Sequence, residues 1–191
     1  MRKGTFQKII QYVDHSIDVE QSFLFDMNDN GDLRLMNKTV SASSEEVDIP
    51  DEYFEKLFNC EGIPVDVHTH PNYNCIPSVL DIAFYLSNEA IREAYIIGRS
   101  HYFHISFPVH RKFVPPSFVE QEYLRIMDEV VKEFDFDKDI PDDTFLCHGI
   151  IDGNNRTTFS TFFSVPESMA TEVSLRLMDA FGIMEYEIGV L

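Results

Sequence analysis

The stretch that decides the fold is residues 63–87, which read IPVDVHTHPNYNCIPSVLDIAFYLS. It begins with a short apolar run, continues through a turn-rich segment with Asn and Pro, and ends with residues at helical spacing. This order predicts a strand, a loop and a helix, and Ser78 is the expected N-cap of that helix. His68 and His70 then lie where the strand ends, and Asp81 lies one turn into the helix.

His68, His70 and Asp81 form a candidate metal site. Alternate residues on an extended chain project to one side, so two imidazoles two residues apart at the end of a strand can flank one metal ion. The N-terminus of the following helix can be aimed at the loop that carries the histidines, which places Asp81 as the third ligand. Two imidazole nitrogens and one carboxylate leave a fourth tetrahedral position for water, which is typical of catalytic rather than structural zinc. A histidine pair alone is more often packing or surface, but this spacing favours Zn²⁺ and hydrolysis.

The residues before this stretch predict a helix, a hairpin and a second helix. Apolar side chains at helical spacing favour a helix over residues 6–15. Two β-rich runs, residues 19–25 and 33–40, are separated by an Asn-Gly turn, which is typical of a β-hairpin. A polar loop at residues 41–50 leads into a helix that has Pro50 in its first turn.

After this stretch, two strands complete a first domain and an αββαβ extension follows. Residues 94–98 and 102–109 have the pattern of strands, so a mixed α/β unit closes there, ahead of a Pro-Pro pair. We therefore expect a domain at residues 1–110 and a small C-terminal extension at residues 111–191. The expected elements of the extension are a helix, two strands, a helix and a strand, at residues 117–134, 145–151, 157–165, 166–181 and 183–190.

Composition and charge argue against several classes of protein. The chain has 191 residues, of which 44% are apolar, as a globular protein requires. Its formal net charge of −18 repels phosphate backbones and anionic lipid head groups, so we expect no nucleic-acid or membrane partner. No apolar run is long enough for a membrane span, and the first residues lack the apolar core of a signal peptide, which predicts a cytoplasmic protein. The three cysteines have no CxxC spacing, so any metal must be held mainly by His and carboxylate.

The spacing of the candidate site resembles a family motif. His68-x-His70-Pro71 followed by Ser78-x-x-Asp81 resembles the JAMM motif of the JAB/MPN metalloproteases, the zinc isopeptidases that remove ubiquitin-like tags. This resemblance implies a zinc-dependent hydrolase, deubiquitinase-like, that cleaves an isopeptide or peptide bond after the C-terminus of a ubiquitin-like protein or a sulfur-carrier-like relative. The implied partner is a ubiquitin-like protein or its conjugate.

The resemblance extends beyond the motif. Residues 68–75, HTHPNYNC, are similar to the HSHPGYGC form of eukaryotic members, whereas Pro77 before the serine is closer to prokaryotic relatives. The order of elements over residues 5–109 also looks like the MPN fold, a mixed curved β-sheet flanked by helices. Residues 111–191 add no resemblance, so the fold class expected for the whole chain is α/β (α+β) with an extension of unknown role.

The family also uses a glutamate on an upstream strand, and Glu20 is the best match. It follows the first expected helix, opens an apolar run and stands 48 residues before His68. The family usually has a glycine three residues after this glutamate, and this chain has Phe23 there. By resemblance, zinc polarises a water, Glu20 takes its proton and delivers it to the leaving amine, and Ser78 hydrogen-bonds the oxyanion. Weaker candidates stand in a polar loop or on or beside an exposed helix, namely Glu45, Glu46, Glu52, Glu55 and Glu61.

Two other functions compete with the isopeptidase hypothesis. The first is a non-catalytic MPN domain that only binds neighbouring proteins; such domains usually lack the metal ligands, and this chain keeps them. The second is a metal-dependent peptidase or amidase that acts on small peptides or conjugates and would use the same site. For the isopeptidase hypothesis, residues 111–191 are a candidate region for substrate choice or for a protein partner.

A calcium site is a weaker interpretation of the expected hairpin. The first half of an EF-hand loop is matched by four residues, Asp26, Asn28, Asn30 and Gly31. Asn37 stands where that loop needs a bidentate glutamate, and both flanks are expected to be strands rather than helices. We therefore expect a hairpin turn here.

Other histidines and cysteines are not expected to form a second metal site. His101 and His104 stand three apart on an expected strand, so their side chains should face opposite sides. The same alternation separates Cys147 from His148. Cys75 is expected beside the candidate site, with no role as a ligand.

Overall fold

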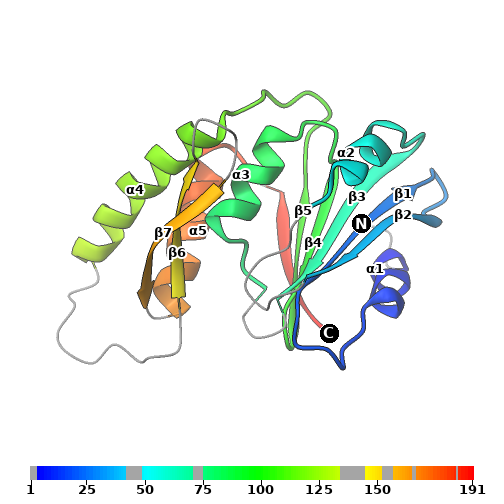
Figure 1. Cartoon of the computed structure of the whole chain (residues 1–191), viewed down its shortest axis with the longest axis horizontal. Coiled ribbons are helices and arrows are strands. Elements are labelled where there is room, and N and C mark those ends of the chain that lie inside the picture. Colours follow the sequence, from blue (N-terminus) through cyan, green and yellow to red (C-terminus); the bar gives the residue numbers. More distant parts are fainter. Residues whose placement is uncertain are drawn as a thin grey trace. The chain divides into compact units, whose positions relative to one another are not determined.

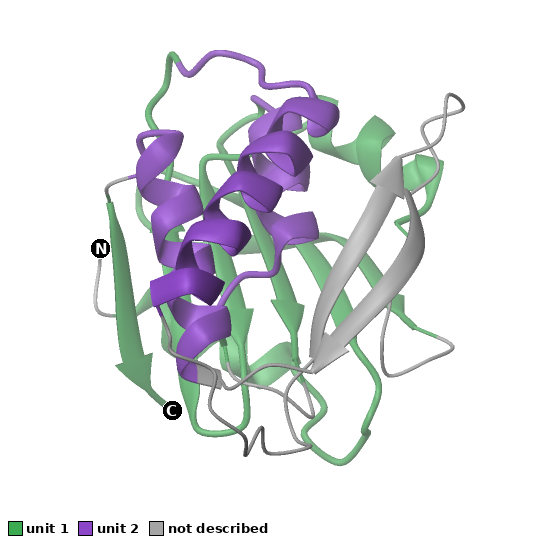
Figure 2. Cartoon of the chain, turned by 90° about the vertical axis from the view of Figure 1, so that its left-hand side faces the viewer, with its two compact units in different colours: residues 1–75, 90–110, 185–191 green, residues 76–89, 111–184 purple. Residues whose placement is uncertain are grey.

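The structure, a computed structural model, describes residues 4–41, 49–70, 75–133, 145–151, 157–164, 167–183 and 185–191. The chain splits into two compact units, which Figure 2 draws in separate colours. Unit 1 consists of residues 1–75, 90–110 and 185–191, and unit 2 of residues 76–89 and 111–184. Most of the expected polar loop, at residues 42–48, and the expected turn between the strands of the extension, at residues 152–155, lie outside the described residues.

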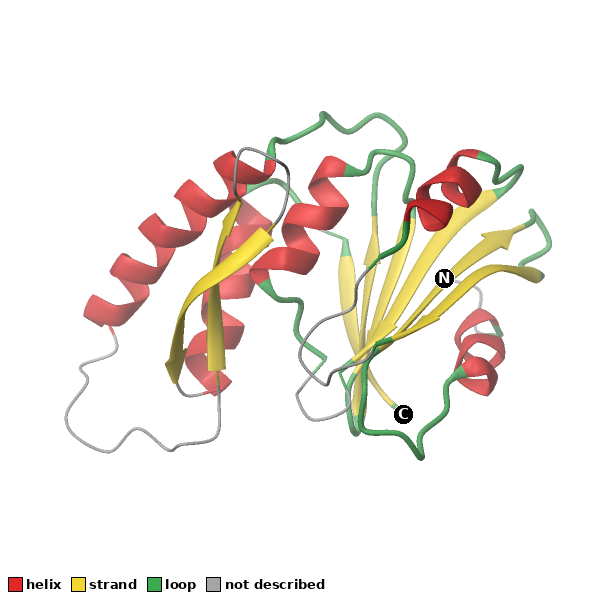
Figure 3. Cartoon of the chain, in the orientation of Figure 1, coloured by secondary structure: helices red, strands yellow, loops and turns green. Residues whose placement is uncertain are grey.

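Unit 1 is built on a six-stranded mixed sheet (Figures 1 and 3). Its strands are β1 (Gln21–Met27), β2 (Leu33–Val40), β3 (Ile63–Thr69), β4 (Glu93–Ile97), β5 (His101–Ser106) and β8 (Tyr186–Val190). Their order is β2-β1-β3-β4-β5-β8, and every neighbouring pair is antiparallel except β3 and β4, which are parallel. The helices of this unit are α1 (Thr5–Ile9), continued by the 3₁₀ turn η1 (Ile10–Tyr12), and α2 (Asp51–Phe58). A mixed sheet accompanied by helices agrees with the predicted mixed α and β class.

One face of the sheet packs on α1. Phe23 lies opposite Val67 and Phe25 lies opposite Val65 in the ladder between β1 and β3, and all four side chains are fully buried. Ile9 of α1 joins the same apolar cluster. Full burial of a side chain of this size is worth about 1.5–3 kcal/mol. The cluster therefore stabilises the pairing of β1 with β3 and, with it, the position of the histidine segment at the end of β3.

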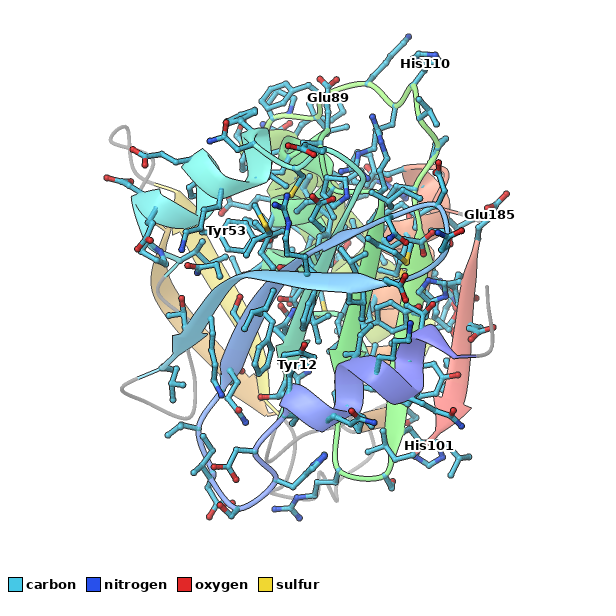
Figure 4. The ribbon with its side chains drawn as sticks, turned by 90° about the vertical axis from the view of Figure 1, so that its right-hand side faces the viewer. Tyr12, Tyr53, Glu89, His101, His110 and Glu185 are labelled. Carbon is cyan, nitrogen blue, oxygen red and sulfur yellow. The ribbon has the colours of Figure 1, made fainter. Side chains whose placement is uncertain are left out.

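The opposite face of β3 carries polar groups. Side chains alternate along a strand, so Asp66 and His68 project from the face opposite to that of the valines. α2 covers this side, because the buried Tyr53 hydroxyl on α2 donates a hydrogen bond to Asp66. Figure 4 labels Tyr53 on this helix.

The predicted hairpin between β1 and β2 is confirmed. In its turn, the Asn28 side-chain oxygen accepts a hydrogen bond from the backbone N–H of Asp32 at 2.9 Å. Gly31 has a φ of 81°, a left-handed conformation that glycine adopts without steric cost. Asp26, the first residue of the EF-hand match, is bonded to the Arg34 guanidinium at 2.7 Å. These groups thus stabilise a turn between two strands, as expected.

The described part of unit 2 consists of helices and a small antiparallel sheet. The elements are α3 (Val79–Ser87), α4 (Pro116–Glu133), β6 (Phe145–Ile151), β7 (Thr157–Ser164) and α5 (Glu167–Ala180). The Arg176 guanidinium on α5 donates two hydrogen bonds to Glu133 on α4, at 2.9 and 2.6 Å. The buried Ser174 hydroxyl donates to the backbone oxygen of Pro77 at 2.7 Å, so α5 also supports the segment from which α3 begins.

The first helix is shorter than the periodicity of residues 6–15 predicts. It ends at Ile9, the 3₁₀ turn ends at Tyr12, and Val13 is extended. The reason is a tertiary contact: the Gln21 side chain accepts from the backbone N–H of Asp14 and donates to its carbonyl, at 3.0 and 2.9 Å. The N–H and carbonyl of Asp14, which would form hydrogen bonds within a longer helix, are therefore bonded to a side chain of β1.

The final strand lies in the sheet of unit 1. β8 pairs with β5 along its length, with Ile188 opposite Phe103. The expected strand at residues 183–190 therefore exists, but it extends the main sheet instead of staying with the other elements of the expected extension. The division into domains at residues 1–110 and 111–191 stays a prediction. None of the helices in the described residues is both long enough and apolar enough to cross a membrane.

Candidate metal centre

Strand pairing places the two histidines at the end of β3. His68 lies between β1 and β4, opposite Ser22 on one side and Ile96 on the other. His70 follows the last residue of β3, and its backbone N–H donates to Ile97 of β4 at 2.8 Å. Each histidine is 8% exposed. The backbone of both residues is thus held by neighbouring strands, which limits the movement of the two rings.

The two imidazoles face each other through their Nε2 atoms. Nε2 of His68 lies 3.2 Å from Nε2 of His70, and the ring planes are tilted by 53°. Two nitrogens bound to one tetrahedral zinc at the usual bond length are separated by about 3.3–3.4 Å. The same distance also allows an N–H···N hydrogen bond when one of the rings carries its proton on Nε2. The spacing therefore suits a shared metal ion, and a metal-free histidine pair is the alternative explanation.

Ser78 and Asp81 form a capping box at the start of α3. The Ser78 hydroxyl oxygen accepts a hydrogen bond from the Asp81 N–H at 3.2 Å. In return, Oδ2 of Asp81 accepts from the Ser78 N–H at 2.6 Å and from its hydroxyl at 2.7 Å. The predicted N-cap is confirmed. The arrangement fixes the Asp81 carboxylate at the positive end of the helix, where negative charge is stabilised.

The three expected ligands come together. His68, His70 and Asp81 each offer one ligand atom, and these atoms all lie within 4.8 Å of one another. Two imidazoles and a carboxylate are the donor set of many catalytic zinc sites, and they also suit Fe²⁺. The side chains present in the structure therefore fit a transition-metal ion. This much of the cofactor prediction is supported; the identity of the metal stays a prediction.

Glu20 lies immediately before β1, at the end of β1 that pairs with the histidine end of β3. Its backbone oxygen accepts from the Ser41 N–H at 2.9 Å. The N–H of Gln21 donates to Oγ1 of Thr69 at 2.9 Å, so β1 still contacts β3 at this point. Continuing the antiparallel register of β1 and β3 puts the backbone of Glu20 opposite that of His70. The residue is half-buried, and its role as a general base stays a prediction.

The weaker glutamate candidates lie elsewhere. Glu52 is exposed and forms an ion pair with Lys56 at 2.7 Å, one turn along α2. Glu55 and Glu61 are also exposed. Glu45 and Glu46 lie outside the described residues. Exposed carboxylates on a helix or turn have no evident part in a buried histidine site.

Sequence reasoning missed two polar residues beside the histidines, Asp66 and Tyr53. Asp66 is 2% exposed, and its Oδ2 lies 3.5 Å from Nδ1 of His68. Its Oδ1 accepts a hydrogen bond of 2.6 Å from the fully buried Tyr53 hydroxyl. The signal in the sequence is an aspartate inside an apolar run, two residues before His68 and therefore on the same face of the strand.

The structure describes three of the other histidine and cysteine side chains considered above, those of His101, His104 and Cys75. His101 is exposed at the start of β5 (Figure 4), whereas His104 is 5% exposed and contacts the Glu93 carboxylate, so the two rings do face opposite sides. Cys75 is buried and is not part of the described group of three ligands. The side chains of Cys147 and His148 lie outside the described residues.

No family model, curated protein or solved structure matches the chain. The JAB/MPN resemblance therefore rests on the motif, on the residues around it and on the order of elements expected from the sequence. The fold and the donor set described above stand independently of that resemblance.

Proposed function

We propose that this chain is a zinc-dependent hydrolase of the JAMM type, with an MPN-like fold, that cleaves an isopeptide or peptide bond after the C-terminus of a ubiquitin-like protein. The observation that carries the proposal is the donor set: paired Nε2 atoms 3.2 Å apart and an Asp81 ligand atom within 4.8 Å of both histidines. The motif spacing and the mixed sheet support it. The substrate class rests on the resemblance.

In this proposal His68, His70 and Asp81 hold the metal ion. When bound, zinc supplies a Lewis acid that polarises a carbonyl oxygen and lowers the pKa of a water molecule. Because the three ligand atoms all lie within 4.8 Å of one another, they are close enough together to hold a single ion.

Glu20 is the proposed general base and acid. An ionised carboxylate can accept a proton from water. The protonated carboxyl can then donate to the leaving amine, which must be protonated to depart. Its place opposite His70 in the continued β1–β3 register supports this role.

Ser78 is the proposed donor to the oxyanion of the tetrahedral intermediate. Its hydroxyl donates a hydrogen bond to Asp81 at 2.7 Å, so this bond must break before the hydroxyl can donate to a substrate. The position supports the role, because the N-terminus of α3 favours negative charge nearby.

A non-catalytic binding domain is the second candidate. Ser78 and Asp81 satisfy each other as a helix cap, and the two imidazoles can share a proton, so the residues also make a coherent structure without a metal. In that case His68, His70 and Asp81 stabilise the fold only. Zinc stoichiometry separates the two candidates.

The test combines metal analysis with a cleavage assay on the purified chain of 191 residues. Wild type, His70→Ala and Glu20→Ala are compared by elemental analysis and on ubiquitin-like fusions, with defined small peptides alongside. His101→Ala and Glu55→Ala, which change an exposed histidine and an exposed glutamate, are the matched controls. Zinc in all samples except His70→Ala, with fusion cleavage lost in both site variants and kept in both controls, supports the proposal. Absence of zinc from wild type overturns it in favour of the binding domain, and cleavage of small peptides alone overturns the proposed substrate class.

A further inference from the structure

Asp66 is a buried carboxylate in an apolar strand. It is 2% exposed and pairs in the sheet with Leu24 on one side and Ala94 on the other. An ionised carboxylate removed from water is costly unless polar groups stabilise it. The burial of the Asp66 carboxylate therefore depends on the polar groups beside it.

Tyr53 and His68 are two polar neighbours of Asp66 among the described residues. The Tyr53 hydroxyl donates to Oδ1 of Asp66 at 2.6 Å. Burial, together with the Asp66 charge, raises the pKa of the Tyr53 hydroxyl well above its ordinary value, so the tyrosine stays protonated and remains a donor. A carboxylate held by this donor on one oxygen has its other oxygen 3.5 Å from Nδ1 of His68.

The position of Asp66 bears on the tautomer of His68. An ionised carboxylate can only accept hydrogen bonds, so it favours a proton on the ring nitrogen that faces it, which is Nδ1. The separation of 3.5 Å is longer than an ordinary N–H···O hydrogen bond but short enough for the negative charge to act on that proton. With the proton on Nδ1, the lone pair of the ring is on Nε2, and Nε2 is the atom that faces His70.

We propose that Asp66, held by Tyr53, is a positioning residue that keeps His68 in its Nδ1–H tautomer with the Nε2 lone pair directed toward His70. Metal-binding histidines commonly donate their second N–H to a carboxylate, which fixes the ring and strengthens the ligand. As a device for metal binding, this inference rests on the proposed function. The inference about the tautomer itself does not require a bound metal.

The first measurement is the tautomer itself. Imidazole ¹⁵N spectra of histidine-labelled metal-free chain are recorded at about pH 8.5, two units above the ordinary histidine pKa. The His68 signals are assigned by their absence from His68→Gln. We expect His68 with its proton on Nδ1 in wild type and a mixture of tautomers in Asp66→Asn. An Nε2–H tautomer in wild type overturns the inference.

The second measurement is zinc affinity by competition with a chelator. Loss of a partner of this kind weakens metal binding by about 10–100-fold, so we expect that range for Asp66→Asn and a smaller loss for Tyr53→Phe. The matched control is Asp26→Asn, which changes another buried aspartate that bonds Arg34 instead of a histidine. The control should lose stability and keep both the tautomer and the zinc affinity.

The outcomes separate this inference from the proposed function. Wild type that binds no zinc but shows the Nδ1–H tautomer overturns the metal site and supports the positioning role of Asp66. Folded Asp66→Asn with unchanged tautomer and zinc affinity overturns the positioning role and leaves the metal site standing. If Asp66→Asn does not fold, Tyr53→Phe takes its place, and an unchanged tautomer and affinity in that variant overturn the role of the tyrosine and with it the proposed pair.

Discussion

Nε2 of His68 lies 3.2 Å from Nε2 of His70 at the end of β3, and both rings are buried. Two neutral nitrogens at this distance repel each other if both present lone pairs, unless a proton or a cation lies between them. A metal ion would remove that repulsion, and the neighbouring Asp81 ligand atom would offset its charge. This relationship makes metal content the first property to measure.

Wild-type chain should bind zinc in equimolar amount. Because the ion binds the folded state, free zinc at 100 times its dissociation constant should raise the free energy of unfolding by about 2.7 kcal/mol. Thermal unfolding with zinc, and again after chelation, measures this difference. His70→Ala should abolish it and His101→Ala should keep it, because His101 lies exposed on β5. Stabilisation by zinc that survives in His70→Ala would place the metal elsewhere.

Ser78→Ala should reduce turnover by about 10²–10³-fold, the usual effect of removing one donor to an oxyanion. It also removes the side-chain cap of α3, which costs about 1 kcal/mol of stability. Ser78→Thr keeps a hydroxyl at the cap and is the control. Steady-state kinetics, zinc analysis and urea unfolding of both variants separate the two effects. Full activity in Ser78→Ala with intact zinc shows that the hydroxyl has no catalytic role.

Glu20→Gln should lower turnover by about 10²–10⁴-fold, the range for loss of a general base, while leaving zinc content and folding unchanged. The amide has nearly the same shape but cannot take up a proton at neutral pH. Glu55→Gln, on the exposed surface of α2, is the matched control. Kinetics and elemental analysis of both variants check this prediction. Equal activity of the two variants would remove Glu20 from the mechanism.

Asp26→Asn should lower the free energy of unfolding by about 1–3 kcal/mol at neutral pH, because it weakens charge-assisted hydrogen bonds to a buried carboxylate. Burial raises the pKa of the Asp26 carboxyl. Hydrogen bonds from Arg34 and from two backbone N–H groups together lower this pKa by more than burial raises it, so the pKa lies below its ordinary value. Its stabilising contribution is therefore present above the unfolded-state pKa of about 3.9 and disappears as the pH falls through the folded-state pKa.

Urea unfolding of wild type and Asp26→Asn across this acid range measures the effect, and the difference between them should shrink as the pH falls. Asp32→Asn is the control, since the Asp32 side chain is 65% exposed and its ion pair with Lys8 contributes little. A stability loss in Asp26→Asn no larger than in this control, or one that grows on acidification, contradicts the prediction.

Features held by short-range bonds were predicted well. The capping box joins Ser78 to Asp81 within a single helical turn, and the hairpin turn is closed by Asn28 on Asp32. Such bonds connect residues three or four apart, so the local order of residue types is enough to predict them. The pairing of His68 with His70 could be predicted for the same reason, because the two residues stand two apart at the end of one strand.

Features held by distant partners could not be predicted in the same way. The first helix stops early because Gln21 bonds the backbone of Asp14. The pairing of β8 with β5 joins segments more than 80 residues apart in the chain. The partner of Asp66 is Tyr53 on another element, and no local pattern relates the two residues.

By itself, the amino-acid sequence determined the type of each main element, the turn at Gly31, the cap at Ser78 and the identity of the candidate ligands, because these follow from periodicity and from bonds between near neighbours. Only the tertiary structure decided which strands pair, that Glu20 precedes the strand beside the histidines, and that Asp66 and Tyr53 lie behind His68. The physical reason is that strand pairing and side-chain burial are settled by the packing of the whole sheet, in which each strand takes the neighbour that buries its apolar face and satisfies its backbone.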